Sequence, residues 1–222
     1  MASYIRPEEL RFAALATDVV CFRIINNELH VLLGKVNSEG PHNGMWAHIG
    51  GLIRPEETAD KAVCRLLKDK AGISKIYFEQ LYTFSKVDRD PRGRVVSVAH
   101  MALCGDDPQD NPEHTALTEW VKVSKAPKLG YDHNEILDVA LDRLRSKFEY
   151  TNIAQHLLLP EFTLTDLQKV YETVIGKGFD KRNFRKKILA TGMIKDTGKV
   201  FKNGPMRPAA LYAFVSKKQE IT

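Results

Sequence analysis

A short basic segment near the C-terminal end carries the residue types that read nucleic acid. Arginine and asparagine can hydrogen-bond base edges in the major groove, and lysines near helix ends can neutralise phosphates. Phe184 and Ile188 are spaced i, i+4, so in a helix they face the interior and leave the basic side chains outside. The candidate DNA contacts of this segment are Lys181, Arg182, Asn183, Arg185, Lys186 and Lys187. A solvated basic helix in a winged helix that binds only protein is the alternative.

The charge of the chain is unevenly distributed. The 222 residues have a formal net charge of +5. Residues 161–222 contain 13 Lys and Arg against 6 Asp and Glu, a charge of +7, which leaves −2 for residues 1–160. Such asymmetry is expected of a nucleic-acid-binding module joined to a domain with another task.

A second set of residues follows a fixed spacing between positions 51 and 73. It consists of Gly51, Glu57, Arg65, Leu67, Gly72 and Ile73. This spacing resembles the Nudix box, G-x5-E-x7-R-E-U-x-E-E-x-G-U, in which U is aliphatic. The preceding residues 44–47, which include Trp46, and Gly50-Gly51 are similar to the stretch that leads into that box.

The resemblance implies glutamates that hold divalent cations on a pyrophosphate, but here those positions are Leu66, Asp69 and Lys70. Residues 66 and 70 share one helical stripe, so we expect a leucine and an ammonium group to face the metal space. A cation there disfavours Mg²⁺ by several kcal/mol, on the order of 332/(ε·r) with an effective ε of about 20. We expect no required cofactor, no catalytic residues, and Mg²⁺ on Glu57 and Asp69 only if residual hydrolase activity exists.

The rest of the first part predicts strands and two helices around this box. Strands are expected over 17–25, 28–36, 46–53, 76–85, 94–104 and 116–123, with a turn at Asn26-Asn27. One amphipathic helix begins after Thr58 and ends at Gly72, and another runs from 133 to 147 with Asp132 as its cap. The three cysteines have no disulfide or zinc spacing and are interpreted as core residues.

Periodicity weakens between residues 148 and 160, which predicts domains over 1–150 and 151–222. Thr163 and Asp166 resemble a capping box for a helix that ends at Gly176, and Asp180 can cap the basic helix. Short strands over 193–196, 199–201 and 209–215 predict a wing, with Lys199, Lys202 and Arg207 as further DNA contacts. The expected class is α+β: a Nudix-type α/β/α sandwich with a mixed sheet, followed by a winged helix-turn-helix.

The combination resembles the Nudix-related transcriptional regulators, notably in residues 88–97, 131–137 and 180–187. The resemblance covers residues 18–214. It implies a homodimeric bacterial repressor whose degenerate Nudix domain binds a small-molecule effector and whose winged helix binds double-stranded operator DNA. In branches of that family the effector is ADP-ribose, with targets in NAD metabolism, or a sugar, with targets in sugar catabolism.

The candidate ligand contacts are Trp46, Gly50, Gly51, Glu57, Arg65, Lys70, Arg89, Arg92, Arg94 and His133. Lys70 could contact an anionic group of the ligand, and the alternative is that it belongs to a solvated helix face. For the arginines of residues 89–94 the alternative is a charged turn, and for residues 132–133 it is an ordinary helix cap. The alternative function is an active Nudix hydrolase of ADP-ribose or another nucleoside diphosphate derivative. With no apolar run long enough to span a bilayer and no signal-peptide pattern, we expect a cytoplasmic protein without membrane contact.

Overall fold

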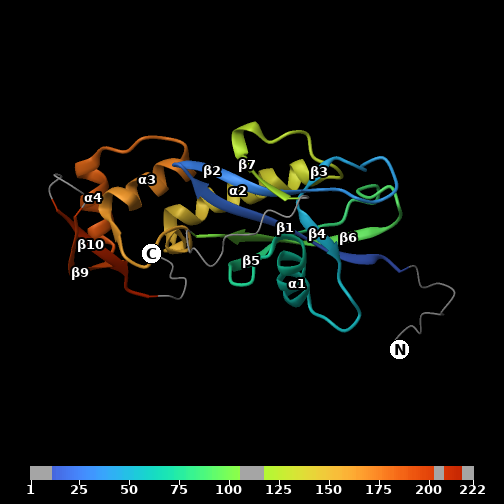
Figure 1. Ribbon diagram of the computed structural model, residues 1–222, viewed down its shortest axis with the longest axis horizontal. Coiled ribbons are helices and arrows are strands. Elements are labelled where there is room, and N and C mark those ends of the chain that lie inside the picture. Colours follow the sequence, from blue (N-terminus) through green and yellow to red (C-terminus); the bar gives the residue numbers. More distant parts are fainter. Residues whose placement is uncertain (1–11, 106–117, 203–207, 217–222) are drawn as a thin grey trace, which may run out of the picture.

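The computed structural model describes residues 12–105, 118–202 and 208–216. The molecule is elongated (Figure 1). The strands are β1 (Ala14–Ile25), β2 (Glu28–Lys35), β3 (Trp46–Ala47), β4 (Ile49–Leu52), β5 (Tyr77–Phe84), β6 (Val95–Leu103), β7 (Thr118–Lys122), β8 (Phe162–Thr163), β9 (Ile194–Phe201) and β10 (Ala209–Phe214). The helices are α1 (Ala59–Ala71), α2 (His133–Tyr150), α3 (Leu164–Ile175) and α4 (Lys181–Ala190), with 3₁₀ turns η3 (Val123–Lys125) and η4 (Ile153–Leu157).

The first seven strands form one mixed sheet with β1 at its centre. β1 pairs antiparallel with β2 and β4 and parallel with β6, and the order along the sheet is β3-β2-β1-β6-β5. Seven consecutive residues of β1, from 16 to 22, are buried, as expected of a strand covered on both faces. Asn26 and Asn27 both have positive φ, 53° and 60°, which suits the tight turn that the sequence predicts before β2.

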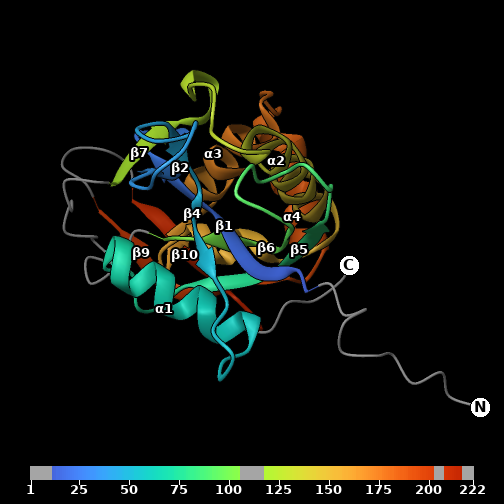
Figure 2. The ribbon, with the colours of Figure 1, turned by 90° about the vertical axis from the view of Figure 1, so that its right-hand side faces the viewer.

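Helices cover both faces of this sheet, which confirms the predicted sandwich (Figure 2). Val63, Leu66 and Leu67 of α1 pack against β1, β2 and β4 on one face. The apolar stripe of α2 packs against the other face, over β1, β2 and β6. Thr58 and Gly72 cap α1 as predicted. Cys21 and Cys104 are core residues, but Cys64 is exposed, because it lies on the outer face of α1.

The second part of the chain is a winged helix. Thr163 and Asp166 form the predicted capping box of α3, and Asp180 caps α4 by accepting from the Asn183 N–H. The predicted strands over 193–196 and 199–201 are instead one strand, β9. A bulge interrupts the pairing of β9 with β10 without ending β9. At this bulge Gly198 has a φ of 74°, and the Thr197 hydroxyl donates to the Leu211 carbonyl.

Helix α2 connects the two parts. Its apolar residues belong to the same buried cluster as those of α3 and α4. At its C-terminal end Phe148 contacts the ring of Tyr171 of α3, with centroids 5.0 Å apart, and Tyr171 contacts Phe184 of α4 at 5.4 Å. None of the helices in the described residues has the length and apolar character needed to cross a membrane.

Candidate functional site

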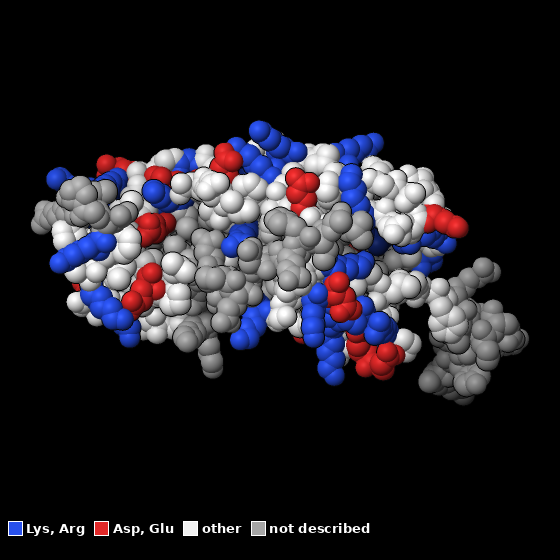
Figure 3. Space-filling view, viewed as in Figure 1, with Lys and Arg blue, Asp and Glu red and all other residues white. Residues whose placement is uncertain are grey.

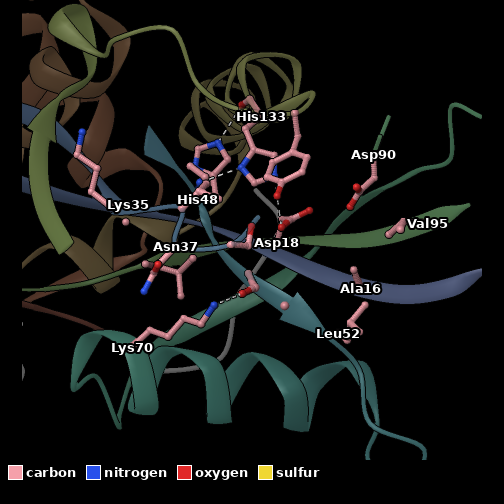
Figure 4. Close-up of a pocket in the computed structure, with 18 of the residues that line it drawn as sticks. Ala16, Asp18, Lys35, Asn37, His48, Leu52, Lys70, Asp90, Val95 and His133 are labelled. Atoms are coloured by element: carbon pink, nitrogen blue, oxygen red, sulfur yellow. Dashed lines mark hydrogen bonds and ion pairs between the residues drawn. The ribbon is translucent and has the colours of Figure 1, made fainter. Parts of the chain in front are cut away.

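A cavity of about 600 Å³ lies in the first part of the molecule (Figure 4). Its walls come from β1, β4, the loop after β2, the end of α1, the loop between β5 and β6 and the start of α2. The cavity therefore draws on residues from position 16 to position 133. This volume lies within the range that is usual for small-molecule binding sites.

The base of the cavity holds a buried ion-pair network around Arg89. The Arg89 guanidinium donates to both oxygens of Asp132, at 2.8 and 2.7 Å, and to Oδ2 of Asp18 at 3.2 Å. The Ser97 hydroxyl also donates to Oδ2 of Asp18, at 2.7 Å. These three charged side chains are at most 9% exposed. One guanidinium thus joins β1, the β5–β6 loop and the start of α2.

The network fixes the charge of Asp18. Burial opposes ionisation of this carboxyl, but His133, the Ser97 hydroxyl and Arg89 together hold the pKa of Asp18 below its usual value. With one guanidinium between two carboxylates, the network has a formal charge of −1. Asp132 is the N-cap residue of α2, as predicted, but its side chain makes no capping hydrogen bond. Both of its oxygens accept from the Arg89 guanidinium instead.

Two buried histidines, His48 and His133, stack beside this network with ring centroids 5.2 Å apart. The backbone N–H of His48 donates to Nδ1 of His133 at 2.9 Å, so the proton of neutral His133 is on Nε2, 3.5 Å from Oδ1 of Asp18. Nε2 of His48 donates to the His133 carbonyl at 3.0 Å. Burial, with the neighbouring His133, lowers the pKa of His48 to about 3, so this ring is neutral at physiological pH.

The pKa of His48 predicts how the stability of the protein depends on pH. Between about pH 6.5 and pH 3 the unfolded chain binds a proton at His48 that the folded chain does not, so this residue stabilises the fold above that window and loses its contribution as pH falls. His48→Gln keeps a donor for the His133 carbonyl and does not titrate. Its unfolding free energy, measured by urea denaturation, should therefore fall less steeply on acidification, by up to about 1.4 kcal/mol per pH unit.

The matched control is His30→Gln, at a half-buried position of β2 outside the stacked histidine pair. It reports the effect of exchanging a histidine for a glutamine elsewhere in the same sheet. Equal slopes for His48→Gln and the wild type would show that the His48 ring titrates alike in the folded and unfolded chains, contrary to its buried environment.

Gly50 allows two polar groups to approach β4. A Cβ on Gly50 would lie 2.1 Å from Oδ1 of Asp18 and 2.9 Å from the Thr17 carbonyl oxygen, so any side chain there collides with the network. The Lys70 ammonium donates to the Gly50 carbonyl at 2.6 Å, and Figure 4 shows its side chain extending from α1 to β4. Burial lowers the pKa of Lys70, and the charge of Asp18 opposes that shift.

Glu57 and Arg65 form a local clamp outside the cavity. Arg65 donates to both oxygens of Glu57, at 3.0 and 2.5 Å, and the Arg54 N–H donates to one of them at 2.8 Å. Arg65 also donates to the Leu52 carbonyl. The ion pair with Arg65, helped by the Arg54 N–H, lowers the pKa of Glu57 to about 2. The clamp ties the segment after β4 to α1.

These residues do not fit a divalent cation. Mg²⁺ needs oxygen ligands in octahedral array, yet both oxygens of Glu57 already accept hydrogen bonds, and Lys70 reaches the same edge of β4. Asp69 is the only carboxylate of α1 that lines the cavity. Within the described ranges, no group of three His, Cys, Asp or Glu side chains is arranged to hold a metal ion.

Leu66 departs from the expectation that it faces the metal space. It is 4% exposed and packs into the core, where its Cδ2 lies 2.9 Å from the position of a Cβ on Gly51. Its spacing from Val63 and Leu67 places it on the apolar stripe of α1, so burial determines its direction. Lys70, one turn later, lines the cavity as expected.

The structure brings together part of the predicted ligand set. Gly50, Gly51, Lys70, Arg89, Arg92 and His133 line the cavity, whereas Trp46, Glu57, Arg65 and Arg94 do not. The region of residues 89–94 is only partly a solvated turn, since Arg89 and Asp90 are buried and Asp90 is paired with Arg92 at 2.7 Å. The role of each residue as a ligand contact stays a prediction.

Sequence reasoning missed two cavity residues, Asp18 and His48. The sequence does contain a signal for Asp18, because it is the one charged residue in the buried stretch of β1. Burying a charged side chain without a partner costs free energy, so a charge at this position indicates an ion pair or a functional role. His48 carries no comparable local signal. Its position beside His133, 85 residues away in the sequence, arises from the packing of β4 against the start of α2.

Helix α4 presents the predicted basic surface. Phe184 and Ile188 are buried, and the side chains of Lys181, Arg182, Asn183, Lys186 and Lys187 are exposed. Arg185 is half-buried and donates to the Thr165 hydroxyl at 3.4 Å. Lys199 on β9 pairs with Glu161 at 2.8 Å, Lys202 is exposed, and Arg207 lies outside the described residues. Lys and Arg side chains are prominent at the end of the molecule that carries α4, β9 and β10, with acidic side chains between them (Figure 3).

The two parts of the chain match two different protein families. Residues 14–140 match the NUDIX domain, and residues 154–214 match the NrtR DNA-binding winged helix domain. The ADPR-responsive transcriptional repressor NtrR of Acinetobacter baylyi is 34% identical over 90% of this chain and 81% of its own length. Shewanella oneidensis NrtR in complex with a 27mer DNA superposes with a TM-score of 0.78 at 30% identity, covering 90% of this chain and 93% of that one.

The isolated NUDIX domain of Shewanella oneidensis NrtR in complex with ADP-ribose is also similar. It is 28% identical, has a TM-score of 0.54, and covers 63% of this chain and 94% of its own. Two family models account for most of the chain, and relatives with the same two parts match it over nine tenths of its length. The chain therefore belongs to the Nudix-domain proteins that carry an NrtR DNA-binding winged helix.

Proposed function

We propose that this protein is a transcriptional repressor whose winged helix binds operator DNA and whose Nudix cavity binds ADP-ribose as the effector. The relatives with a bound DNA and a bound ADP-ribose support each half of the proposal. The observation that carries it is the course of α2. This helix begins with His133 in the cavity wall, and close to its C-terminal end Phe148 contacts Tyr171, which in turn contacts Phe184 of α4.

Helix α2 supplies a direct mechanical route between the two sites. Its 18 residues span about 27 Å at 1.5 Å per residue. Asp132, just before the helix, is held by Arg89 at the base of the cavity. A ligand that alters this ion pair changes the position of α2 and with it the packing of α3 and α4. Such coupling requires that the ligand bind the two arrangements with different affinity.

In this proposal the protein acts as a homodimer in the cytoplasm, and each subunit presents one α4 helix to a half-site of the operator. Paired recognition helices are the usual arrangement for helix-turn-helix proteins. A fluorescence anisotropy titration with the DNA upstream of its own gene tests it. Sequence-selective binding that weakens with salt is expected, and equal affinity for unrelated DNA of the same length would contradict it.

We further propose that the Nudix domain binds ADP-ribose without hydrolysing it. The clamp on Glu57 and the absence of a converging carboxylate set in the described residues support this proposal. Incubation with ADP-ribose and Mg²⁺ or Mn²⁺ should release no AMP above background. Robust turnover that is abolished by Glu57→Gln would instead establish the alternative, an active Nudix hydrolase. Arabinose serves as the test ligand for a sugar effector.

Tyr171→Leu should weaken the communication between the two sites. The substitution keeps an apolar side chain in the cluster but removes the ring that contacts both Phe148 and Phe184. ADP-ribose and DNA should each still bind, while the fold-change that ADP-ribose causes in DNA affinity, typically about 5- to 150-fold in coupled systems, should shrink. Anisotropy titrations with and without ADP-ribose measure this factor.

Phe214→Leu is the control for loss of an aromatic contact within the winged helix, because Phe214 pairs with Phe162 on the β8–β10 side, 5.2 Å away. It should retain the coupling of the wild type. A Tyr171→Leu protein with undiminished coupling would exclude the path through α2 and α3.

A further inference from the structure

His48 lines the cavity but uses only one of its two ring nitrogens within the described part of the chain. The residue is 4% exposed, and its ring stacks on His133 in the cavity wall (Figure 4). Nε2 donates to the His133 carbonyl at 3.0 Å. Nδ1 is also buried, yet it forms no hydrogen bond with any of the residues that the structure describes. This leaves one nitrogen in the cavity wall whose hydrogen bond a ligand can supply.

The contact of Nε2 determines what Nδ1 can bind. A carbonyl oxygen only accepts, so Nε2 carries the ring proton. Burial lowers the pKa of His48 to about 3, so the ring is neutral at physiological pH and Nδ1 keeps its lone pair. Buried acceptors without a donor are rare in folded proteins, because each one costs free energy. A ligand group that satisfies Nδ1 must donate a hydrogen, as a hydroxyl does.

The charge beside the two histidines selects against a phosphate. Arg89 lies between Asp18 and Asp132, so this network has a formal charge of −1. Nε2 of His133 lies 3.5 Å from Oδ1 of Asp18, which places the network next to the stacked rings. A diphosphate would meet a like charge here and, at His48, a nitrogen that cannot donate to it. An uncharged group with hydroxyls suits both features.

We propose that Nδ1 of His48 accepts a hydrogen bond from a hydroxyl group of the terminal ribose of ADP-ribose, so that this ribose lies against the two histidines. The proposal rests on the proposed function and names the part of the ligand that meets this wall of the cavity. The terminal ribose carries more free hydroxyl groups than the ribose of the adenosine half, and it is the part that ADP lacks. His48 then makes the cavity select ADP-ribose over ADP.

Two substitutions of His48 separate ligand recognition from stability, with calorimetric titration of the full-length protein as the measure of ADP-ribose affinity. His48→Gln keeps a donor near the position of Nε2 but has no acceptor near that of Nδ1. It should bind ADP-ribose about 5- to 150-fold more weakly than the wild type, as expected when a buried hydrogen bond loses one partner.

His48→Asn has the opposite pattern, with a carbonyl oxygen near the position of Nδ1 and no donor near that of Nε2. It should bind ADP-ribose more tightly than His48→Gln does, although urea denaturation should show it to be the less stable of the two. If His48 only supported the fold, the less stable variant would also be the weaker binder.

His30→Gln is the matched control, because His30 lies on β2 and does not line the cavity. It should bind ADP-ribose as the wild type does. ADP is the comparison ligand. It should bind the wild type more weakly than ADP-ribose does, and His48→Gln should not weaken it further.

Two results would overturn the proposal while leaving the proposed function intact. One is a folded His48→Gln protein that binds ADP-ribose with wild-type affinity. The other is an equal loss of affinity for ADP and for ADP-ribose in that variant, because the contact would then not involve the terminal ribose. Failure of the wild type to bind ADP-ribose would instead contradict the proposed effector itself.

Discussion

Replacement of Arg89 by leucine is expected to lower the free energy of unfolding by about 3–5 kcal/mol, because it leaves Asp18 and Asp132 as buried carboxylates without their counterion. Both carboxylates are at most 9% exposed, so water cannot replace the guanidinium. Chemical denaturation at neutral pH measures the loss. Because the same residue joins β1 to the start of α2, ADP-ribose binding should also be lost.

The pH dependence separates loss of an ion pair from loss of packing. Burial opposes ionisation of Asp18, and Arg89 is one of the groups that hold the pKa of this carboxyl below its usual value, so without Arg89 that pKa rises from its wild-type position. The stability that a lowered folded-state pKa contributes is present above the ordinary pKa of Asp and is lost as pH falls through the folded-state pKa. The difference between variant and wild type should therefore narrow as pH falls below about 4, the ordinary pKa of Asp.

Arg94→Leu is the control for this variant. Arg94 lies five residues later in the same region, is exposed, and donates to the carbonyls of Ser85 and Lys86. Its loss should cost less than about 1 kcal/mol. An Arg89→Leu protein that is no less stable than Arg94→Leu, at every pH, would show that the network does not hold the cavity together.

Arg182→Ala is expected to weaken operator binding by about 1–3 kcal/mol, or roughly five- to 150-fold, if its guanidinium reads a base edge. Arg182 lies on the exposed side of α4, opposite Phe184 and Ile188. Arg185 is half-buried and donates to Thr165, so Arg185→Ala should have the smaller effect on DNA affinity. Lys186→Ala should reduce affinity for all sequences and lower the salt slope by about 0.9 if it neutralises one phosphate.

Arg145→Ala is the charge-matched control for these DNA-binding variants. Arg145 is an exposed arginine of α2, where it lies 3.9 Å from Asp142, and it is not part of the winged helix. The variant should bind DNA as the wild type does. If Arg182→Ala and Arg145→Ala weaken binding equally, the effect is one of net charge, and α4 is not the recognition helix.

The ends of the helices were predictable because their signals are local. Thr58 and Thr163 accept from backbone N–H groups three residues later, and Gly72 and Gly176 adopt positive φ where α1 and α3 end. The sequence was misleading where a residue distant in the chain binds a side chain that could otherwise cap a helix. The carboxylate of Asp132 could cap α2, but it binds Arg89, 43 residues away.

The candidate site was predictable only in part for the same reason. The spacing of the Nudix box lies within one loop and one helix, so Gly51 and Lys70 could be found from the sequence and both line the cavity. Asp18 and His48 come from separate segments that only the folded sheet brings next to His133. Arg89 was among the predicted ligand contacts, but its ion pair with Asp18 depends on the same packing. The position of Leu66 in the Nudix box suggests that its side chain faces the metal space. Its place on the apolar stripe of α1 directs the side chain into the core instead.

Communication between the cavity and the winged helix should appear as an effect of ADP-ribose on DNA affinity. The affinity of the full-length protein for its own upstream DNA is measured by anisotropy with and without saturating ADP-ribose, at one salt concentration. We expect ADP-ribose to change the dissociation constant at least fivefold, a coupling of about 1 kcal/mol or more. If calorimetry shows that ADP-ribose binds but specific DNA binding is unchanged, the cavity and the winged helix do not communicate.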